Sequence, residues 1–307
     1  MRVALLAGGT GGTKLAHGFA LLGDSVELSV VANVGDDIEL HGLHISPDLD
    51  ALLYTLSGLI DAERGWGIRG DTHSAHAQLE RLGAPTWFTL GDADLGTHLH
   101  RTRLLDEGLS LTDATASMAA ALGIKDRLLP ATDGRLRTRL ETDAGLLDFQ
   151  DYFVRLHQEP VVTGVRFDGL DEARPTASVL EAIRSADLIV IGPSNPFLSI
   201  GPILALGGMR EAIIRASVRK IAVSPIVGGR ALRGPADRML VSLGHEATAL
   251  GVARLYEGLV DRFVIDETDA DLAPAIAALG MAADVMPTVM GDAEGRRSLA
   301  ERIIGLA

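Results

Sequence analysis

Acidic side chains gather directly after one predicted strand. The stretch LSVVANVGDDIELHGLHISPDLDALLY places an apolar run ahead of four carboxylates, which are Asp36, Asp37, Asp48 and Asp50. Mg²⁺ prefers carboxylate oxygens and bridges them to substrate phosphates, so this cluster could hold a hard cation. The plainer interpretation is a helix cap at Asp48 and a turn at Asp36 and Asp37, because Asp is common in both. The residues by themselves leave these two interpretations open.

A glycine-rich loop follows the first apolar run, in the sequence MRVALLAGGTGGTKLAHG. A helix that begins in such a loop offers unpaired N–H groups and the positive end of its dipole, which together suit a phosphate. The spacing departs from both familiar phosphate loops. Thr13 separates the glycines from Lys14, and Lys14 stands where the dinucleotide fingerprint has its third glycine. A tight turn that packs a strand on its helix is the structural alternative.

Two later apolar runs also end in polar and glycine-rich turns. The first, DLIVIGPSNPFLSIGPIL, carries Ser194 and Asn195, and the second, KIAVSPIVGGRALRGPADRML, carries Ser224, Gly228, Gly229 and two arginines. Glycine lets the backbone approach a ligand closely, and Arg can grip a phosphate with two donors. One such turn is usually only a turn. Three of them in one parallel sheet predict a ligand-binding crevice.

A further polar stretch, WFTLGDADLGTHLHRTRLL, combines Asp92 and Asp94 with His98 and Arg101. An exposed helix start explains the two acids, because acidic residues favour the first turn of a helix. We expect His98 and His100 to be surface histidines. The chain has no HExxH, no GxSxG and no Cys/His ligand set, so zinc chemistry and a hydrolase triad are disfavoured.

Short apolar runs alternate with helical patterns along the chain. The runs are Val3–Ala7, Leu28–Ala32, Leu188–Ile191, Ile221–Val223 and Phe263–Ile265. This alternation predicts an α/β, Rossmann-like fold with a mostly parallel sheet flanked by helices and ligands at the carboxyl ends of the strands. We expect residues 1–60 and 160–307 to form the nucleotide-binding core. Residues 61–159 are predicted to be an inserted, smaller cap, with helices around 95–105 and 114–122 and a β-like piece at 127–153.

Composition excludes several classes of protein. The chain has 307 residues, of which 47% are hydrophobic and 22% are charged, as in an ordinary soluble globule. It lacks Cys, a signal peptide and an apolar run long enough to span a bilayer, so we expect a cytoplasmic protein with no membrane partner. A net charge of -13 and an aromatic content of 4% disfavour nucleic acid as a partner. An anionic substrate would therefore need a metal ion, Lys or Arg at its site.

Several long motifs occur together and in a fixed order: GGTGGTKL, NVGDD, SPDLDALLY, RGWGI, WFTLGDADLGTH, GPSNPFLSIGPIL and SPIVGG. Over roughly residues 1–270 the chain resembles the 2-phospho-L-lactate transferase family (CofD/FbiA-like) of coenzyme F-420 biosynthesis. The resemblance implies transfer of a phospholactyl-type group, 2-phospho-L-lactate or in many bacteria phosphoenolpyruvate, from a guanosine diphosphate-linked donor. The acceptor would be the ribityl hydroxyl of the deazaflavin FO, with release of GMP and assistance by Mg²⁺.

The same resemblance implies roles for particular residues. Asp36, Asp50 and Lys14 would be catalytic, and Asp36 and Asp50 would hold Mg²⁺, with Asp37 or Asp48 as further candidates. The glycine loop would then hold part of the donor without needing the spacing that grips a γ-phosphate. The predicted nucleotide-binding residues are Gly9, Thr10, Gly11, Gly12, Ser194, Asn195, Ser224, Gly228 and Gly229.

The deazaflavin side of the site is predicted from the cap. Asp50 would orient the attacking hydroxyl of FO, and Trp66, Trp87 and Asp92 would cover its ring system and exclude water. Position 89, associated with FO in the family, is often Lys or Arg there, whereas this chain has Thr89. That departure removes a cation or hydrogen-bonding partner from the predicted FO site.

Two other functions stay open at this point. The related gluconeogenesis-factor proteins bind nucleotide sugars and share the glycine loop and the acidic turn, so a regulatory protein without turnover is one alternative. A dinucleotide-dependent oxidoreductase is the other, and the missing third glycine disfavours it. The sequence does not distinguish lactate, enolpyruvate and glycerate as the acid of the donor, and it leaves open whether the chain forms a homodimer.

Overall fold

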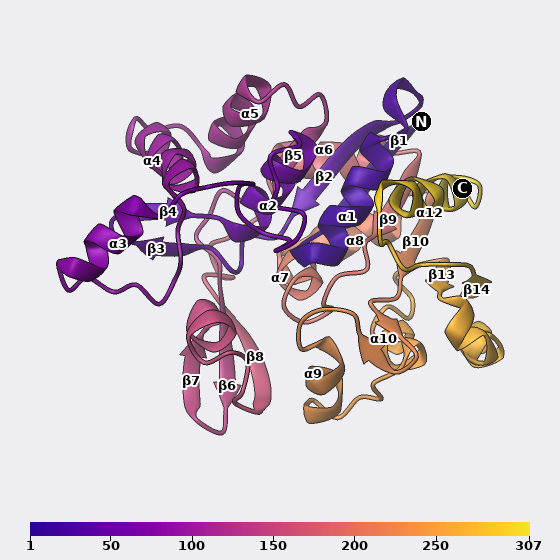
Figure 1. Cartoon of the computed structure of the whole chain (residues 1–307). Helices are drawn as coiled ribbons and strands as arrows, with labels where there is room; N and C mark the ends of the chain where they lie inside the picture. The colour runs from indigo at the N-terminus through magenta and orange to yellow at the C-terminus, as the bar shows by residue number, and fades with distance from the viewer.

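Seven parallel strands form the central sheet of the computed structural model, which describes residues 1–307 (Figure 1). Their order is β14-β13-β10-β9-β1-β2-β5, and every neighbouring pair is parallel. The strands are β1 (Arg2–Ala7), β2 (Glu27–Ala32), β5 (Arg127–Pro130), β9 (Leu188–Ile191), β10 (Arg219–Val223), β13 (Arg262–Ile265) and β14 (Ala282–Val285). Each of the five predicted apolar runs is a strand of this sheet, and the prediction of a Rossmann-like α/β fold is confirmed.

Burial explains why the inner strands read as unbroken apolar runs. Every residue from Val3 to Ala7 in β1 is at most 1% exposed, because helices cover both faces of the sheet. Strands β14 and β5 form the two edges of the sheet; β14 is not among the predicted runs, and β5 falls in the β-like piece at 127–153 that was predicted for the cap. All four residues of β14 are half-buried or exposed, so its apolar signal is weak.

Helices pack on the two faces of the sheet. Figure 1 shows α1 (Gly9–Ala20) and α12 (Ala293–Ile304) in front of the strands, with α6 (Ala177–Ser185) and α8 (Met209–Arg215) behind them. Helix α1 also packs against α2 (Pro47–Leu56), and α7 (Ile200–Ala205) packs against α8 and β1. The remaining elements of the C-terminal half are β11 (Ile226–Val227), β12 (Arg230–Ala231), α9 (Ala236–Ser242), α10 (Ala249–Leu255), η3 (Glu267–Leu272) and α11 (Ala273–Ala277).

Smaller elements form two projections beside the sheet. One contains the hairpin β3 (Ile38–Leu40) and β4 (Leu43–Ile45) with α3 (Ser74–Arg81), α4 (Asp92–Asp106) and α5 (Leu111–Ala121) (Figure 1). The predicted helices around 95–105 and 114–122 are thus present as α4 and α5. The other is an antiparallel sheet, β7-β6-β8, of β6 (Arg137–Thr142), β7 (Gly145–Asp148) and β8 (Val162–Asp168), with the turn η2 (Asp151–Arg155). A short turn, η1 (Gly23–Ser25), precedes β2.

Two strands cross the predicted division between core and cap. Strand β5 lies inside residues 61–159 but pairs with β2 in the central sheet, and β8 lies outside that range but pairs with β6. A small second core fastens this antiparallel sheet to the rest of the molecule, because Leu140 and Val162 pack with Leu198 and Met239. None of the helices combines the length and the apolar character that a membrane-spanning segment requires.

Candidate functional site

The carboxyl ends of β1 and β2 bring the glycine loop and the acidic turn together. The N–H of Gly9, the first residue of α1, donates to Asp48 Oδ1 at 2.6 Å. Asn33 Nδ2 donates both to Asp48 Oδ2 at 3.0 Å and to Asp36 Oδ1 at 3.3 Å. One amide nitrogen therefore joins these two carboxylates. The alternative in which Asp48 caps its own helix is wrong, because the N-cap of α2 is Ser46 and Asp48 points to the start of α1.

Asp36 and Asp48 are each 6% exposed and neither forms an ion pair, although the charge of Arg137 acts weakly on Asp36. Burial raises the pKa of Asp36 well above its ordinary value, and the nearby Asp48 and Asp37 raise it further. Burial likewise raises the pKa of Asp48 to about 6, although hydrogen bonds from Asn33 and Gly9 oppose the shift. A pair of carboxylates that repel each other in a buried site is a fit for a hard divalent cation, which favours their ionised forms.

The protein by itself supplies only part of a metal shell at this place. No group of three or more His, Cys, Asp or Glu side chains is arranged to hold a metal ion. Mg²⁺ usually keeps several waters and binds through one or two carboxylates together with substrate phosphates. Two carboxylates at the start of α1, where a phosphate would also bind, match that coordination preference.

Asp50 has a different environment, although it lies only two residues beyond Asp48. Its carboxylate accepts from both terminal nitrogens of Arg101, with Nη1 at 3.3 Å, and Ser46 N–H donates to it at 3.3 Å. Asp50 is 5% exposed and Arg101 is 1% exposed, so this is a buried ion pair. Asp36 therefore lies beside Asp48, whereas Asp50 pairs with Arg101. Asp37 is occupied by His44 at 3.0 Å and Ser46 Oγ at 2.9 Å.

The expectation that His98 is a surface histidine is wrong. Its side chain is 1% exposed, between Asp50 and Asp94, whereas His100 is exposed as expected. The charged residues of α4 are spread around the helix, so the sequence has no apolar stripe to show which face is buried. Spacing was the one signal available, because Asp94, His98 and Arg101 share one face of a helix at i, i+4 and i+7.

The glycines of the first loop have a packing role. A Cβ at Gly11 would lie 2.0 Å from the carbonyl oxygen of Pro193, and one at Gly8 would lie 2.5 Å from Asp48 Oδ2. A Cβ at Gly12 would lie 2.6 Å from Ser194 Oγ, so the loop packs tightly on the end of β9. The N-cap residue, Gly8, has no side chain to cap α1, and Asp48 accepts only the N–H of Gly9. The next N–H groups at the start of a helix lack partners within it, so tight packing coexists here with a positive helix start that is only partly occupied.

Several predicted nucleotide-binding side chains shape the turns in which they lie. Asn195 Oδ1 accepts from the N–H groups of Phe197 and Leu198 at 2.9 and 3.1 Å. Ser224 Oγ accepts from Ile226 N–H at 3.1 Å and donates to its carbonyl at 2.9 Å. These contacts leave the Asn195 amide nitrogen facing the sulfur of Met239 at 3.7 Å.

Two further predicted groups, Ser194 and the Gly228 N–H, are also engaged within the protein. Ser194 Oγ accepts from the N–H of Gly8 at 3.4 Å, which ties the end of β9 to the glycine loop. The Gly228 N–H donates to both carboxylate oxygens of Asp269, at 3.0 and 3.2 Å. The turn after β10 is therefore held by η3, and its first glycine amide is already occupied.

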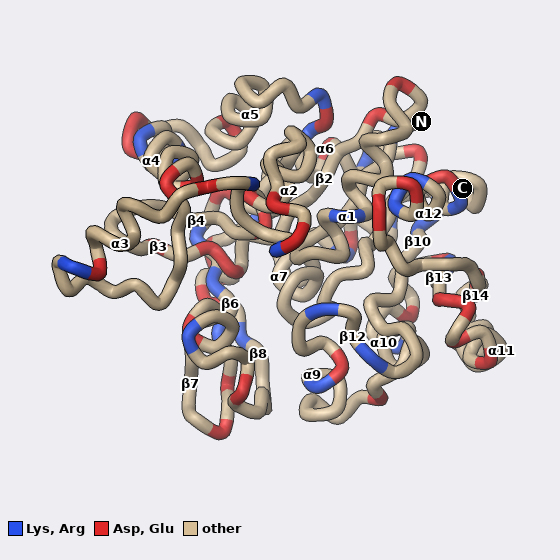
Figure 2. The backbone as a smooth tube through the Cα atoms, viewed as in Figure 1, with Lys and Arg blue, Asp and Glu red and all other residues tan.

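Basic side chains gather beside the glycine loop. Lys14 donates to the carbonyl of Met290 at 3.0 Å, Arg233 donates to the carbonyl of Arg64 at 2.9 Å, and Arg296 contacts a histidine ring. Burial lowers the pKa of Lys14, and the charges of Arg296 and Arg233 lower it further. Figure 2 shows the basic positions of α1 and α12 on neighbouring helices. In a protein of net charge -13, cations that repel one another mark a place suited to an anion.

The residues predicted to cover FO lie in the loops around α3 and α4. Trp66 is 50% exposed, with the Arg64 guanidinium 5.6 Å from its ring centre. Trp87 packs edge-on against Phe88, and Thr89 beside them is half-buried. Asp92, which was predicted to cover FO, forms hydrogen bonds at the start of α3.

Asp92 caps a neighbouring helix. Its carboxylate accepts from Thr72 Oγ1 at 2.5 Å and from the N–H groups of Ser74 and Ala75, at 3.0 and 2.9 Å, which fixes the start of α3. These hydrogen bonds, that from Thr72 first, lower its pKa to about 2. Asp71 in turn accepts from the N–H groups at the start of α4. The two acids therefore hold α3 and α4 together.

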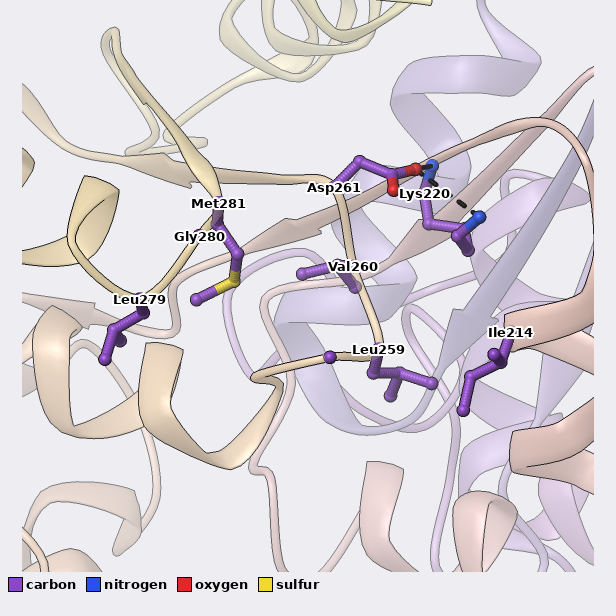
Figure 3. A pocket seen from close by; sticks show the side chains of 9 residues that line it. Ile214, Lys220, Leu259, Val260, Asp261, Leu279, Gly280 and Met281 are labelled. Carbon is purple, nitrogen blue, oxygen red and sulfur yellow. Dashed lines mark hydrogen bonds and ion pairs between the residues drawn. The ribbon is translucent and has the colours of Figure 1, made fainter.

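A separate cavity of about 390 Å³ lies at the other end of the central sheet (Figure 3). Its lining includes Lys220 near the beginning of β10, and Asp261 and Met281, which directly precede β13 and β14. Lys220 Nζ is 3.5 Å from Asp261 and donates to two backbone carbonyls. The glycine loop and the acidic turn follow the opposite, carboxyl ends of the strands, so this cavity is not part of the candidate site.

Comparison with known proteins agrees with the order of the motifs. The family model described as 2-phospho-L-lactate transferase CofD matches residues 3–298. The chain is 42% identical over 302 residues to a 2-phospho-L-lactate transferase of Methanosarcina acetivorans, covering 98% of both chains. It is 41% identical over 314 residues to a phosphoenolpyruvate transferase of Kitasatospora aureofaciens, covering 100% of this chain and 98% of the other.

A solved structure shares the fold at much lower sequence identity. It is a Bacillus halodurans protein of the UPF0052 family, with a TM-score of 0.64 and 19% identity over 99% of this chain and 98% of that one. This likeness concerns the fold, whereas the full-length matches near 40% identity and the family model concern the family. The resemblance expected from the sequence motifs is confirmed, and the chain belongs to the 2-phospho-L-lactate transferase CofD family.

Proposed function

We propose that this chain transfers a phospholactyl-type group from a guanosine diphosphate-linked donor to the ribityl hydroxyl of FO and releases GMP. The observation that carries the proposal is the pair Asp36 and Asp48 at the start of α1, in a chain of this family. A hydroxyl oxygen of FO would form a bond to the phosphorus that bears the acid. The bond from that phosphorus to the oxygen of GMP would break, and the hydroxyl proton would pass to solvent.

Asp36 and Asp48 are the residues that would hold Mg²⁺. Both are buried without a cationic partner, whereas the charge of Asp50 is already balanced by Arg101. We therefore replace the predicted pair Asp36 and Asp50 by Asp36 and Asp48 as the metal ligands. Mg²⁺ bound there would withdraw negative charge from the donor diphosphate as the bond to GMP breaks.

The chain's own cations and N–H groups would bind the donor. Apart from the Gly9 N–H, which Asp48 accepts, the N–H groups at the start of α1 and the positive end of its dipole would face the diphosphate. Lys14 and Arg233 lie close enough for their charges to interact, and Arg233 also contacts the loop that carries Trp66. These groups would stabilise the negative charge that grows on the departing GMP, which is the main task of a protein in phosphoryl transfer.

The acceptor would lie between α2 and the cap. Asp50 would accept a hydrogen bond from the FO hydroxyl and orient it toward the phosphorus. The deazaflavin ring is flat and largely aromatic, so its affinity would come mainly from enclosure by Trp66, Trp87 and their neighbours, with a few placed polar groups. Enclosure would also exclude water, whose attack on the donor would waste it.

A direct assay tests the proposal. The purified protein is incubated with FO, Mg²⁺ and a donor carrying lactate, enolpyruvate or glycerate, each in a separate reaction. We expect GMP and a deazaflavin product of matching mass with at least one donor, and no GMP when FO is omitted or EDTA is present. Binding of a nucleotide sugar without turnover of any donor would instead favour a regulatory protein and contradict the proposal.

A further inference from the structure

A chain of buried polar side chains leads away from Asp50 into the cap. Its members come from α2 and α4, and each is at most 8% exposed: Asp50, Arg101, His98, Asp94 and Tyr54. Placing so many polar groups in a protein interior is unfavourable unless they are paired. The central core already contains 64 buried apolar residues, so the fold does not depend on this cluster for a hydrophobic interior.

Arg101 and Ser46 hold the Asp50 carboxylate in one orientation. Arg101 Nη1 donates to Oδ2 at 3.3 Å, Arg101 Nη2 donates to Oδ1, and Ser46 N–H donates to Oδ2 at 3.3 Å. Each carboxylate oxygen can accept two hydrogen bonds. Oδ2 is therefore fully used, while Oδ1 keeps one acceptor position. A forked Arg contact fixes the plane of the carboxylate, so the direction of that free position is also fixed.

His98 lies against both Arg101 and the Asp50 carboxylate. Its Nδ1 is 3.4 Å from Arg101 Nη1 and 3.6 Å from Asp50 Oδ2. Its Nε2 is 3.3 Å from Asp94 Oδ1, which also accepts a hydrogen bond of 2.5 Å from the Tyr54 hydroxyl. Asp94 thus lies beside the ring of His98 at ion-pair distance, and the hydroxyl of Tyr54 holds Asp94 by a hydrogen bond.

We propose that Arg101 and His98 are positioning residues that act through Asp50 on the acceptor hydroxyl. The inference rests on the proposed function, because it assumes that Asp50 Oδ1 accepts the hydroxyl of FO. Its consequence is that helix α4 of the cap completes the active site: the carboxylate comes from α2 and the groups that aim it come from α4. Misplacing an attacking group by about 1 Å can cost about 100-fold in rate, so the aim of this carboxylate matters.

The first test compares two arginines of the same helix. Arg101→Gln removes the forked contact, and Arg103→Gln is the matched control, because Arg103 is exposed and contacts only Glu107 and the exposed His100 at the surface. We expect Arg101→Gln to lower kcat/KM for FO by about 100-fold, with GDP affinity unchanged, and Arg101→Lys to restore part of the loss. Arg103→Gln should behave as the wild type. Wild-type protein that is inactive with every donor would overturn the proposed function, whereas active wild type with an equally active Arg101→Gln would overturn only this inference.

The second test asks whether Arg101 acts through Asp50. In an Asp50→Asn background, adding Arg101→Gln should lower kcat/KM for FO no further, because the group that it positions is already lost. The same double variant should melt at a higher temperature than Asp50→Asn alone, because it no longer buries an unpaired guanidinium. Losses in kcat/KM that multiply between the two substitutions would mean that Arg101 works independently of Asp50, and the inference would be wrong.

A smaller change tests the far end of the chain. Tyr54→Phe keeps the ring and removes only the hydroxyl that donates to Asp94. We expect kcat/KM for FO to fall by about 3-fold to 10-fold through looser positioning of His98, in the direction of the Arg101→Gln effect but smaller. In Asp50→Asn the same substitution should have no effect on kcat/KM, and an undiminished effect there would contradict a chain that ends at Asp50.

Discussion

Asp48 and Asp50 lie two residues apart in the first turn of α2, yet they have opposite electrostatic environments. Asp48 meets Asn33, the start of α1 and a second carboxylate, and no cation balances it. Asp50 meets Arg101 across a buried ion pair. Side chains two positions apart on a helix point to different sides. The two aspartates of this short motif therefore enter two different environments. A buried carboxylate whose charge has no cationic partner therefore suits a metal ion, whereas a carboxylate already paired with Arg suits an oriented hydrogen bond.

Removing the charge of Asp48 gives the largest expected effect on activity. We expect Asp48→Asn to reduce turnover by at least about 100-fold, because a metal ion worth several kcal/mol to the transition state loses a carboxylate ligand. The measurement is GMP release at several Mg²⁺ concentrations. Asp24→Asn, at an exposed turn before β2 and so at the opposite end of that strand from the motif, is the control. Full turnover of Asp48→Asn at saturating Mg²⁺ would remove Asp48 from the metal site.

Stability should change in opposite directions at the two positions. Asp50→Asn leaves Arg101 buried without a partner and should lower the free energy of unfolding by about 3 to 5 kcal/mol, with the fold retained and most activity lost. Asp48→Asn relieves a buried repulsion and should raise the free energy of unfolding. Urea unfolding of both variants without metal decides the matter. A loss of stability in Asp48→Asn as large as that in Asp50→Asn would erase the contrast between the two sites.

The pH dependence should come from Asp48 and its neighbour Asp36. The pKa of Asp48 is raised from 3.8 to about 6 in the folded protein, so the folded state holds its proton more tightly than the unfolded chain. This stabilisation is complete below the unfolded pKa and is lost as pH rises through about 6. A shift of two units corresponds to about 3 kcal/mol. Thermal unfolding between pH 4 and 7 should show this loss, and Mg²⁺ should reduce it; a flat profile would contradict an unbalanced Asp48.

The nucleotide-binding side of the site should show only a small preference among guanine nucleotides. Because Thr13 separates Gly12 from Lys14, the geometry that grips β- and γ-phosphates should not form, and Lys14 instead contacts the carbonyl of Met290. We expect calorimetry to show that GDP or GMP binds at least as well as GTP, and that Mg²⁺ strengthens GDP binding in the wild type more than in Asp48→Asn. A strong preference for GTP would indicate a different nucleotide chemistry.

The smallest expected effect is at Thr89, on the FO side with Asp50. Thr89 is half-buried, and a short hydroxyl can offer FO only one modest hydrogen bond. We expect Thr89→Ala to change FO affinity by less than about 1 kcal/mol. Thr89→Arg should be tolerated and should tighten binding by stacking on the ring. Fluorescence titration of FO against both variants measures this, and loss of FO binding in Thr89→Ala would make Thr89 a specific ligand.

Much of the fold and part of the site could be predicted from residue patterns. The buried strands β1, β2, β9, β10 and β13 are apolar runs that end in turn residues, and such runs have few alternatives to a parallel sheet. Because the carboxyl ends of parallel strands meet at one edge, the glycine loop and the acidic turn had to be neighbours. Strand β5 was predicted only as part of the β-like piece at 127–153 of the cap, because it lies among cap elements in the sequence and joins the central sheet only at its edge.

The order of residues along the chain specifies which chemical groups stand near the end of β2, whereas the packing of distant segments sets which partner each group meets. Arg101 lies 51 residues beyond Asp50, and the charged residues spread around α4 do not show which of its faces is buried. Because α4 lies against α2, Arg101 pairs with Asp50 and balances its charge. Asp48 and Asp36 have no such partner and share the amide of Asn33. The physical reason is that the state of a buried charge is set by groups within a few ångströms in space, which can come from anywhere along the chain.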